Sequence, residues 1–142
     1  MTWKMNDKEF EAVLALPDER RYAYFIKRVA GWRVLWGLAS GDNWALGADN
    51  QGNKLVPVWP HPRFAAACVN GDWAGYEPCS IDISVWLEEW TPDLVRDGKL
   101  VAVFATPSGK GVGVGPEDLK AHLEDELSIY EWPDLPSEEP ST

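Results

Sequence analysis

The spacing of hydrophobic residues changes at Gly31, and this change restricts the fold more than any other feature of the sequence. Before Gly31, apolar residues recur at intervals of three and four, as on one face of a helix. After it come short apolar runs rich in β-forming residues, separated by turn segments at 40–43 and 49–53. The pattern predicts an α/β (α+β) fold with two N-terminal helices, followed by a mixed, largely antiparallel sheet of about five to six strands with helices packed on it.

Two helices are expected before Gly31. Asn6 and Glu9 have the spacing of a variant capping box for the first helix. Pro17 suits the first turn of the second helix, because proline has no N–H to leave unpaired there. Gly31 is the expected end of this second helix.

The strands are expected to follow in short runs. The first three are predicted to form an antiparallel meander, in which Pro57 places the third strand at an edge or a bulge. The strand at 99–106 is apolar at successive positions, which indicates burial on both faces. The expected strands are 33–38, 44–46, 54–59, 79–81, 99–106 and 111–115.

Three further helices are expected. A small helix begins at Pro62. Another, capped by Asp82 or Ser80, ends or kinks at Pro92, where Thr91 offers a new N-cap. The last helix begins at Pro116. We expect residues 1–130 to form a single domain and the acidic, Pro- and Ser-rich residues 131–142 to form a mobile tail.

Charge is distributed unevenly along the 142 residues. Residues 1–60 carry eight Lys/Arg and seven Asp/Glu, whereas residues 61–142 carry five and sixteen. Such an acidic surface repels nucleic acids and anionic membranes and favours encounter with a basic protein. The sequence has no signal-peptide pattern and no apolar run of roughly 20 residues. We therefore expect a cytoplasmic protein whose two cysteines are reduced.

Nine tryptophans are present, and several lie in or beside the segments 57–64 and 71–78. Indoles combine apolar area with one N–H donor, which suits surfaces where an apolar patch meets a polar ligand. Asp72 and Glu77 flank two aromatic residues in a loop, an arrangement that can recognise a cation or a polar group. The expected binding residues are Trp44, Trp59, His61, Arg63, Asp72, Trp73, Tyr76 and Glu77.

The glycine-rich segment 108–115 has two interpretations. Glycine-rich turns before a helix can hold phosphate groups, but this segment lacks the spacing of a phosphate-binding loop, and Lys110 precedes the glycines it would have to follow. The alternative is a tight hairpin leading into a strand whose alternate glycines admit a neighbouring element. We favour the hairpin.

Metal binding and catalysis have little support in the sequence. The histidines and cysteines lack the close spacing of a zinc site, and Cys68 lies on the apolar face of an alanine-rich helix, where it suits the core better than nucleophilic chemistry. Glu88 and Glu89 are neighbours expected on an exposed helix face. We predict no catalytic residues, no metal site and no cofactor. The residues whose type would suit a metal ion are His61, Cys68, Cys79 and His122.

Several motifs resemble the bacterial DUF2750 family across roughly residues 10–130. They lie at 24–27, 36–38, 41–46, 57–61, 71–78, 86–92, 103–107 and 116–119. This resemblance implies no activity, because the family has no established one and hence no catalytic residues to carry over. The order of elements from residue 54 onward is also loosely similar to the N-terminal part of SseB-like proteins, which would imply a protein-interaction module.

Three functional hypotheses follow. The first is a non-enzymatic protein-binding module, acting as an adaptor, regulator or immunity-type inhibitor, with Trp59, Trp73, Tyr76 and Arg63 as anchors for a basic partner. The alternative is a small-molecule binding domain or weak enzyme with a pocket between residues 57–64 and 71–78. In the third, the indoles build a rigid core and the tail docks through Trp132 and Leu135. The sequence leaves the oligomeric state open.

Overall fold

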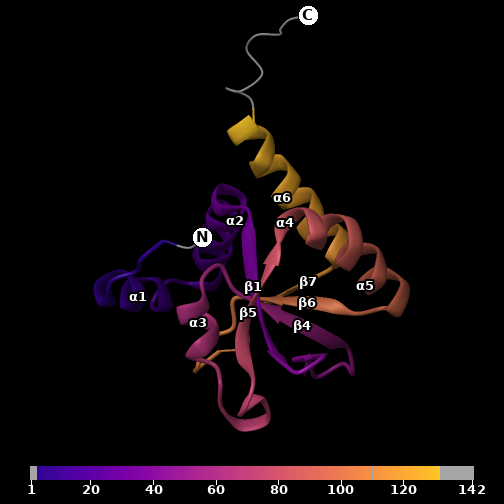
Figure 1. The fold of residues 1–142 in the computed structure, drawn as a ribbon, viewed down its shortest axis with the longest axis horizontal. Coiled ribbons are helices and arrows are strands. Elements are labelled where there is room, and N and C mark those ends of the chain that lie inside the picture. The colour runs from indigo at the N-terminus through magenta and orange to yellow at the C-terminus, as the bar shows by residue number, and fades with distance from the viewer. Residues whose placement is uncertain (1–2, 110, 132–142) are drawn as a thin grey trace, which may run out of the picture.

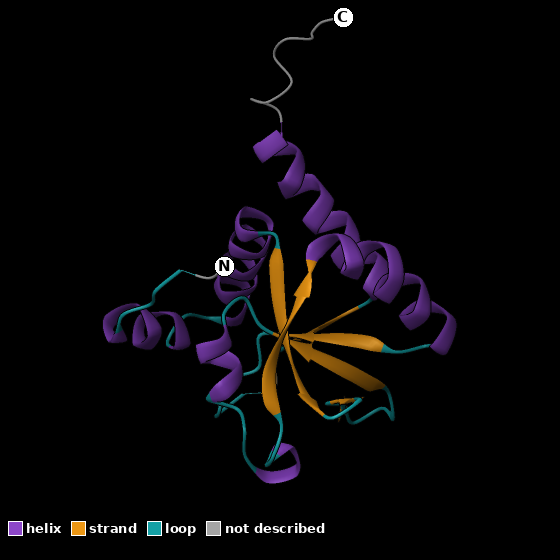
Figure 2. Ribbon diagram, in the orientation of Figure 1, coloured by secondary structure: helices purple, strands orange, loops and turns teal. Residues whose placement is uncertain are grey.

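The computed structural model describes residues 3–109 and 111–131, and in them seven strands form two sheets with helices around them (Figures 1 and 2). Mixed α and β structure, two N-terminal helices and mainly antiparallel pairing confirm the predicted fold class.

The N-terminal helices are α1 (Asp7–Leu14) and α2 (Asp18–Trp32). The side chain of Asn6 caps α1 by accepting a hydrogen bond from the N–H of Glu9 at 2.8 Å, as expected. Helix α2 ends one residue beyond the predicted Gly31, where Arg33 adopts a left-handed conformation and its N–H donates to Val29.

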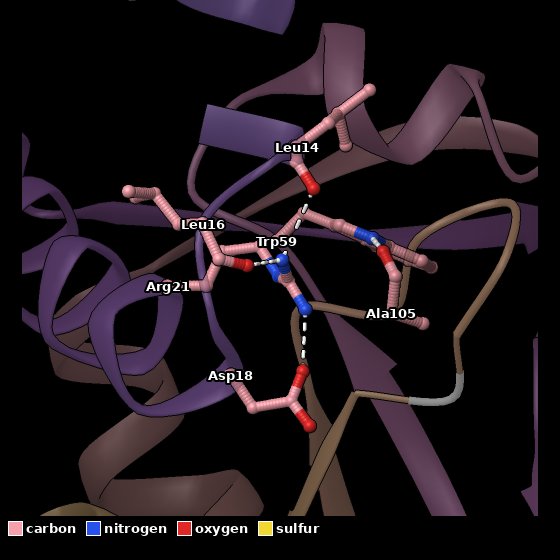
Figure 3. A network of polar contacts seen from close by, with 6 residues as sticks. All are labelled: Leu14, Leu16, Asp18, Arg21, Trp59 and Ala105. Carbon is pink, nitrogen blue, oxygen red and sulfur yellow. Dashed lines mark hydrogen bonds and ion pairs between the residues drawn. The ribbon is translucent and has the colours of Figure 1, made fainter. Parts of the chain in front are cut away.

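A buried arginine fixes the connection between these helices (Figure 3). The guanidinium of Arg21 donates to the carbonyl oxygens of Leu14 and Leu16 and pairs with Asp18. Arg21 also lies 5.9 Å from the ring centroid of Phe104. Because its charge has acceptors on several sides, Arg21 is tolerated at 7% exposure.

The first sheet contains β1 (Val34–Ser40), β2 (Asn43–Trp44) and β5 (Glu77–Asp82), in the order β2-β1-β5. Both pairings are antiparallel. Strand β5 runs along the whole of β1, from Val34 opposite Asp82 to Ala39 opposite Glu77.

The second sheet has the order β3-β4-β6-β7. Its central strands β4 and β6 are parallel, and the outer pairings are antiparallel. An antiparallel bridge joins the two sheets, since the backbones of Trp36 and Trp59 exchange two hydrogen bonds of 2.8 Å. The strands are β3 (Gly47–Ala48), β4 (Lys54–Val58), β6 (Leu100–Val103) and β7 (Val112–Val114).

The predicted three-stranded meander is wrong. Strands β1 and β4 meet only at the Trp36–Trp59 bridge, while their long partners are β5 and β6. Parallel pairing of β4 with β6 requires a long crossover connection, which the helices and β5 between them supply. Pro57 lies within β4 opposite Ala102 of β6, whereas the short strand β3 pairs with β4 at Lys54 and Leu55.

The helix was expected to end or kink at Pro92, and it does not end there. The chain continues from α4 (Ile83–Val85) through one π-helical turn (Trp86–Trp90) into α5 (Thr91–Asp97). The N–H of Thr91 reaches the carbonyl of Trp86, and its hydroxyl donates to the same oxygen at 3.0 Å. Pro92 has no N–H for the regular ladder, and we attribute the wider turn to this loss.

The hydrophobic core lies between the helices and one face of the sheets. Val56 and Val58 of β4 and Val101 and Val103 of β6 point into it and are at most 4% exposed. Helix α6 (Pro116–Glu131) lies beside α2 and α5 (Figure 1). The remaining helical segments are α3 (Pro62–Ala66) and the short helix η1 (Gly71–Trp73).

Candidate functional site

A cavity of about 620 Å³ opens on the face of the second sheet opposite the core. Side chains alternate between the faces of a strand, so the residues between the buried valines point away from the core. Pro57 of β4, Ala102 of β6 and Gly113 of β7 are these residues, and all three line the cavity. The cavity therefore has the sheet itself as its floor.

Small side chains make this floor hollow. Pro57 lies opposite Ala102, and Ala102 lies opposite Gly113, so the three form one row across the sheet. A Cβ at Gly113 would meet only the side chain of Leu55, at 3.5 Å, which is an ordinary contact. Gly113 is thus not required for close backbone packing, and its missing side chain leaves space above the sheet.

Three segments form the walls: residues 47–51, residues 68–73, and residues 105–109 with Gly111. The loop that forms this last wall is anchored to the core at Ala105 (Figure 3). The carbonyl oxygen of Ala105 accepts a hydrogen bond from Nε1 of Trp59 at 2.8 Å and one from Sγ of Cys68 at 3.5 Å. These two buried donors fix the start of the loop against the sheet.

Backbone geometry shapes the same loop. Phe104 has a positive φ of 63° and is buried, which turns the chain sharply as β6 ends. Gly111 packs against this turn, where a Cβ would lie 2.7 Å from the carbonyl oxygen of Val103 and 2.8 Å from the nitrogen of Ala105. Since Gly111 also has a φ of 81°, only glycine fits there without strain.

The turn at residues 49–53 forms a second wall and carries a carboxylate. Oδ1 of Asp49 accepts hydrogen bonds from the backbone N–H groups of Gln51 and Asn53, and Oδ2 accepts one from the Asn53 amide, all at 2.9 Å. The Asn53 side chain, followed by these backbone donors, lowers the pKa of Asp49. Asp49 therefore stays ionised and holds the turn in shape.

Trp73 forms the third wall. Its Nε1 donates to the carbonyl oxygen of Leu46 at 3.2 Å, which ties η1 to the residues before β3. Its ring meets that of Trp59 edge to face, with centroids 6.1 Å apart. Gly47 lies beside the indole, where a Cβ would meet Cζ2 of Trp73 at 3.6 Å. Trp73 thus gives the cavity an apolar side.

Residues 22–123 match the family model described as "Protein of unknown function (DUF2750)". The chain belongs to the DUF2750 family. The match covers well over half of the chain and contains every residue that lines the cavity. No curated protein and no solved structure matches the chain. The looser likeness to SseB-like proteins stays a prediction.

Of the eight predicted binding residues, Trp73 lines the cavity in this DUF2750 chain. Trp59 is completely buried and His61 is 7% exposed, so neither offers surface to a partner. Nδ1 of His61 caps α3 by accepting from the N–H of Arg63 at 3.1 Å, and its Nε2 lies 2.8 Å from the carbonyl oxygen of Trp3. His61 is therefore a structural residue.

The other predicted residues lie apart from the cavity lining. Arg63 pairs with Asp7 at 2.6 Å and lies 4.2 Å from the ring centroid of Phe10, which attaches the N-terminal segment. Trp44 packs edge to face on Trp90, with centroids 4.9 Å apart. Tyr76 is half-buried, Glu77 is exposed on β5, and the side chain of Asp72 lies outside the described part of the structure.

The cavity differs from the predicted pocket between residues 57–64 and 71–78. Among the described residues, it shares Pro57 and Trp73 with those segments, and its other lining residues lie in 47–55, 68–70, 102–109 and 111–113. The turn signals at 49–53 and the alternating glycines at 109–115 marked two of its walls. Neither pattern predicts that β4 pairs with β6, and it is this pairing that brings the two walls together.

The cysteines and histidines are dispersed. Burial raises the pKa of Cys68 to about 11, which keeps it a thiol. Cys79 is exposed, and Nδ1 of His122 lies 2.6 Å from the hydroxyl of Tyr22. Within the described residues, no three His, Cys, Asp or Glu side chains are grouped as metal ligands, and no helix has the length and apolarity to cross a membrane.

Proposed function

We propose that this DUF2750 protein binds a small molecule in the cavity above the second sheet. The observation that carries the proposal is the row of Pro57, Ala102 and Gly113, which leaves a preformed hollow bounded by three walls. Its volume of about 620 Å³ falls within the range of ligand pockets. This is the second of the sequence hypotheses, moved to a different part of the surface.

Polar side chains around the rim support the proposal. Asn50, Gln51, Asn70 and Thr106 line the cavity, and within the described part of the chain their side chains make no hydrogen bond. Each carries both donor and acceptor capacity. A mainly apolar cavity with a few available polar groups is the usual composition of a binding site.

We propose binding without catalysis. Asp49 is the carboxylate lining the described cavity wall, and its lowered pKa makes it a poor general base. Cys68 lines the cavity, but its thiol has a raised pKa and donates to Ala105, so it is a poor nucleophile. We place this binding function in the cytoplasm, in line with the charge and cysteine content.

Ligand-observed NMR with mixtures of metabolites tests the proposal. We expect at least one metabolite to show saturation transfer from the wild-type protein and to lose it in Gly113→Tyr, whose ring would enter the cavity. Ser80→Tyr is the matched control, because Ser80 is exposed on β5 and outside the cavity lining. Binding that persists in Gly113→Tyr would contradict the proposal.

A protein-binding role is a second candidate, favoured by two exposed apolar side chains outside the cavity lining. Trp32 is 39% exposed and Ile129 is 61% exposed, near the C-terminal ends of α2 and α6. The pair Lys27–Glu126 links these two helices at 3.8 Å. Tryptophan is enriched in interface hot spots, and the acidic surface suits a basic partner.

A pull-down with wild type and a Trp32→Ala/Ile129→Ala variant tests this second candidate. A basic protein retained by wild type and lost in the double variant supports it, whereas equal recovery excludes this surface. The third hypothesis, docking through Trp132 and Leu135, concerns residues outside the described structure.

A further inference from the structure

We infer that the cavity binds an uncharged sugar of more than one ring. The inference rests on the proposed function and adds the chemical class of the ligand. Its basis is a volume of about 620 Å³, which is more than one sugar ring fills, together with available polar groups on three sides, apolar surfaces on the floor and one wall, and a negative charge in the turn.

The polar groups surround the cavity. Asn50 and Gln51 belong to the turn after β3, Asn70 precedes η1, and Thr106 belongs to the loop after β6. A ligand that forms hydrogen bonds with the polar side chains of all three walls must carry hydrogen-bonding groups around its whole edge. Sugar hydroxyls have this distribution, and each donates and accepts, as amides and the threonine hydroxyl do.

The apolar surfaces fit the carbon-bound hydrogens of a sugar ring. The N–H of Trp73 is already bonded to the carbonyl of Leu46, so the indole offers a ligand only its carbon surface. Pro57 and Ala102 add aliphatic carbon on the floor. The faces of a six-membered sugar ring present C–H groups, which pack well on an indole and on aliphatic side chains.

The ionised Asp49 disfavours the anionic relatives of such a ligand. Asp49 is ionised beside the cavity and already accepts three hydrogen bonds, leaving room for a hydroxyl donor. The net charge of the chain is −10. Sugar phosphates, uronic acids and nucleotides would meet repulsion from both.

Uncharged nucleosides are the nearest competing class. A bound base is usually held between aromatic or apolar side chains that lie against both of its faces. Among the described lining residues Trp73 is the aromatic one, and the floor beneath it is formed by proline, alanine and glycine. One aromatic wall beside an aliphatic floor favours the sugar.

Titrations followed by ¹⁵N–¹H NMR test the inference, with maltose, cellobiose and lactose as sugars, adenosine and uridine as nucleosides, and glucose 6-phosphate as the anion. We expect saturable shifts with at least one disaccharide, confined to residues 47–51, 68–73 and 105–113. Nucleosides and glucose 6-phosphate should bind at least tenfold more weakly.

Variants locate the binding. Trp73→Ala should weaken the disaccharide at least tenfold, and Trp32→Ala, which removes an exposed indole outside the cavity, should leave its affinity unchanged. Gly113→Tyr blocks the cavity without deleting a side chain, so it tests the site even where Trp73→Ala fails to fold. Ser80→Tyr is its control.

The outcomes separate this inference from the proposed function. Binding of a nucleoside or another metabolite that Gly113→Tyr removes, with no disaccharide bound, overturns the sugar and leaves the proposed function standing. Disaccharide binding that survives in Gly113→Tyr overturns the site. An absence of any cavity ligand in both the metabolite screen and these titrations overturns both.

Discussion

Nε1 of Trp59 donates a hydrogen bond of 2.8 Å to the carbonyl oxygen of Ala105, and both residues are buried. Trp59 directly follows β4 and forms the bridge to Trp36 of β1. Ala105 begins the loop that forms one wall of the cavity. A single indole therefore connects the junction of the two sheets to the shape of the candidate site.

Trp59→Phe should destabilise the protein by about 2–4 kcal/mol, because it leaves a cavity and removes the donor to Ala105. Urea unfolding measures the change. Trp32→Phe is the control, since Trp32 is partly exposed, and it should stay within about 0.5 kcal/mol of wild type. Equal effects of the two substitutions would contradict the role assigned to Trp59.

Gly111→Ala should cost about 3 kcal/mol or more, since it combines a positive φ with a clash against the backbone of β6. Gly52→Ala provides the comparison, because Gly52 has a similar φ of 85° and nothing within 4 Å of a Cβ. It should cost about 1–2 kcal/mol. Thermal or urea unfolding measures the loss of stability in both variants, and the difference between them is the cost of the steric clash. Equal losses would show that the loop adjusts to remove the clash.

The stability of the protein should fall as pH falls below about 6.5, in part through His61. Burial, the largest cause, lowers the pKa of His61, so the unfolded chain binds a proton more readily than the folded one. The stabilisation is complete above the unfolded pKa and is lost as pH falls through the folded pKa. Protonation at Nδ1 would also remove the acceptor for the N–H of Arg63.

His61→Asn isolates this effect. Asparagine can cap α3 without titrating, so the loss of unfolding free energy between pH 7 and pH 5 should be smaller than in wild type. Urea unfolding at several pH values gives the comparison. Identical pH dependence in the two proteins would show that His61 does not contribute.

Local patterns predicted the helices well and the strand pairing poorly. The helix starts at Asn6 and Pro116 depend on residues within one or two helical turns of each other. Local sequence patterns are therefore sufficient to predict them. The parallel register of Pro57 with Ala102 depends on a long crossover. Nothing in either strand alone indicates its partner.

The candidate site was predicted in part for the same reason. The sequence placed Trp59 at a surface because its N–H requires a partner, yet the partner is the carbonyl of Ala105 in the core. The indole N–H of a tryptophan can donate either to a bound ligand or to a backbone carbonyl far away in the sequence, and the sequence does not show which. Trp73 was placed in a binding site and lines the cavity, whereas the floor of Pro57, Ala102 and Gly113 exists only after the strands pair.

The most direct test of the account is the unfolding free energy of wild type, Gly113→Tyr and Ser80→Tyr with and without the metabolite found by NMR. At a ligand concentration of about 100 times Kd, we expect about 2.7 kcal/mol of added stability in wild type and Ser80→Tyr. Gly113→Tyr should fold normally and gain nothing. The same gain in Gly113→Tyr would contradict the claim that the cavity above the second sheet is the binding site.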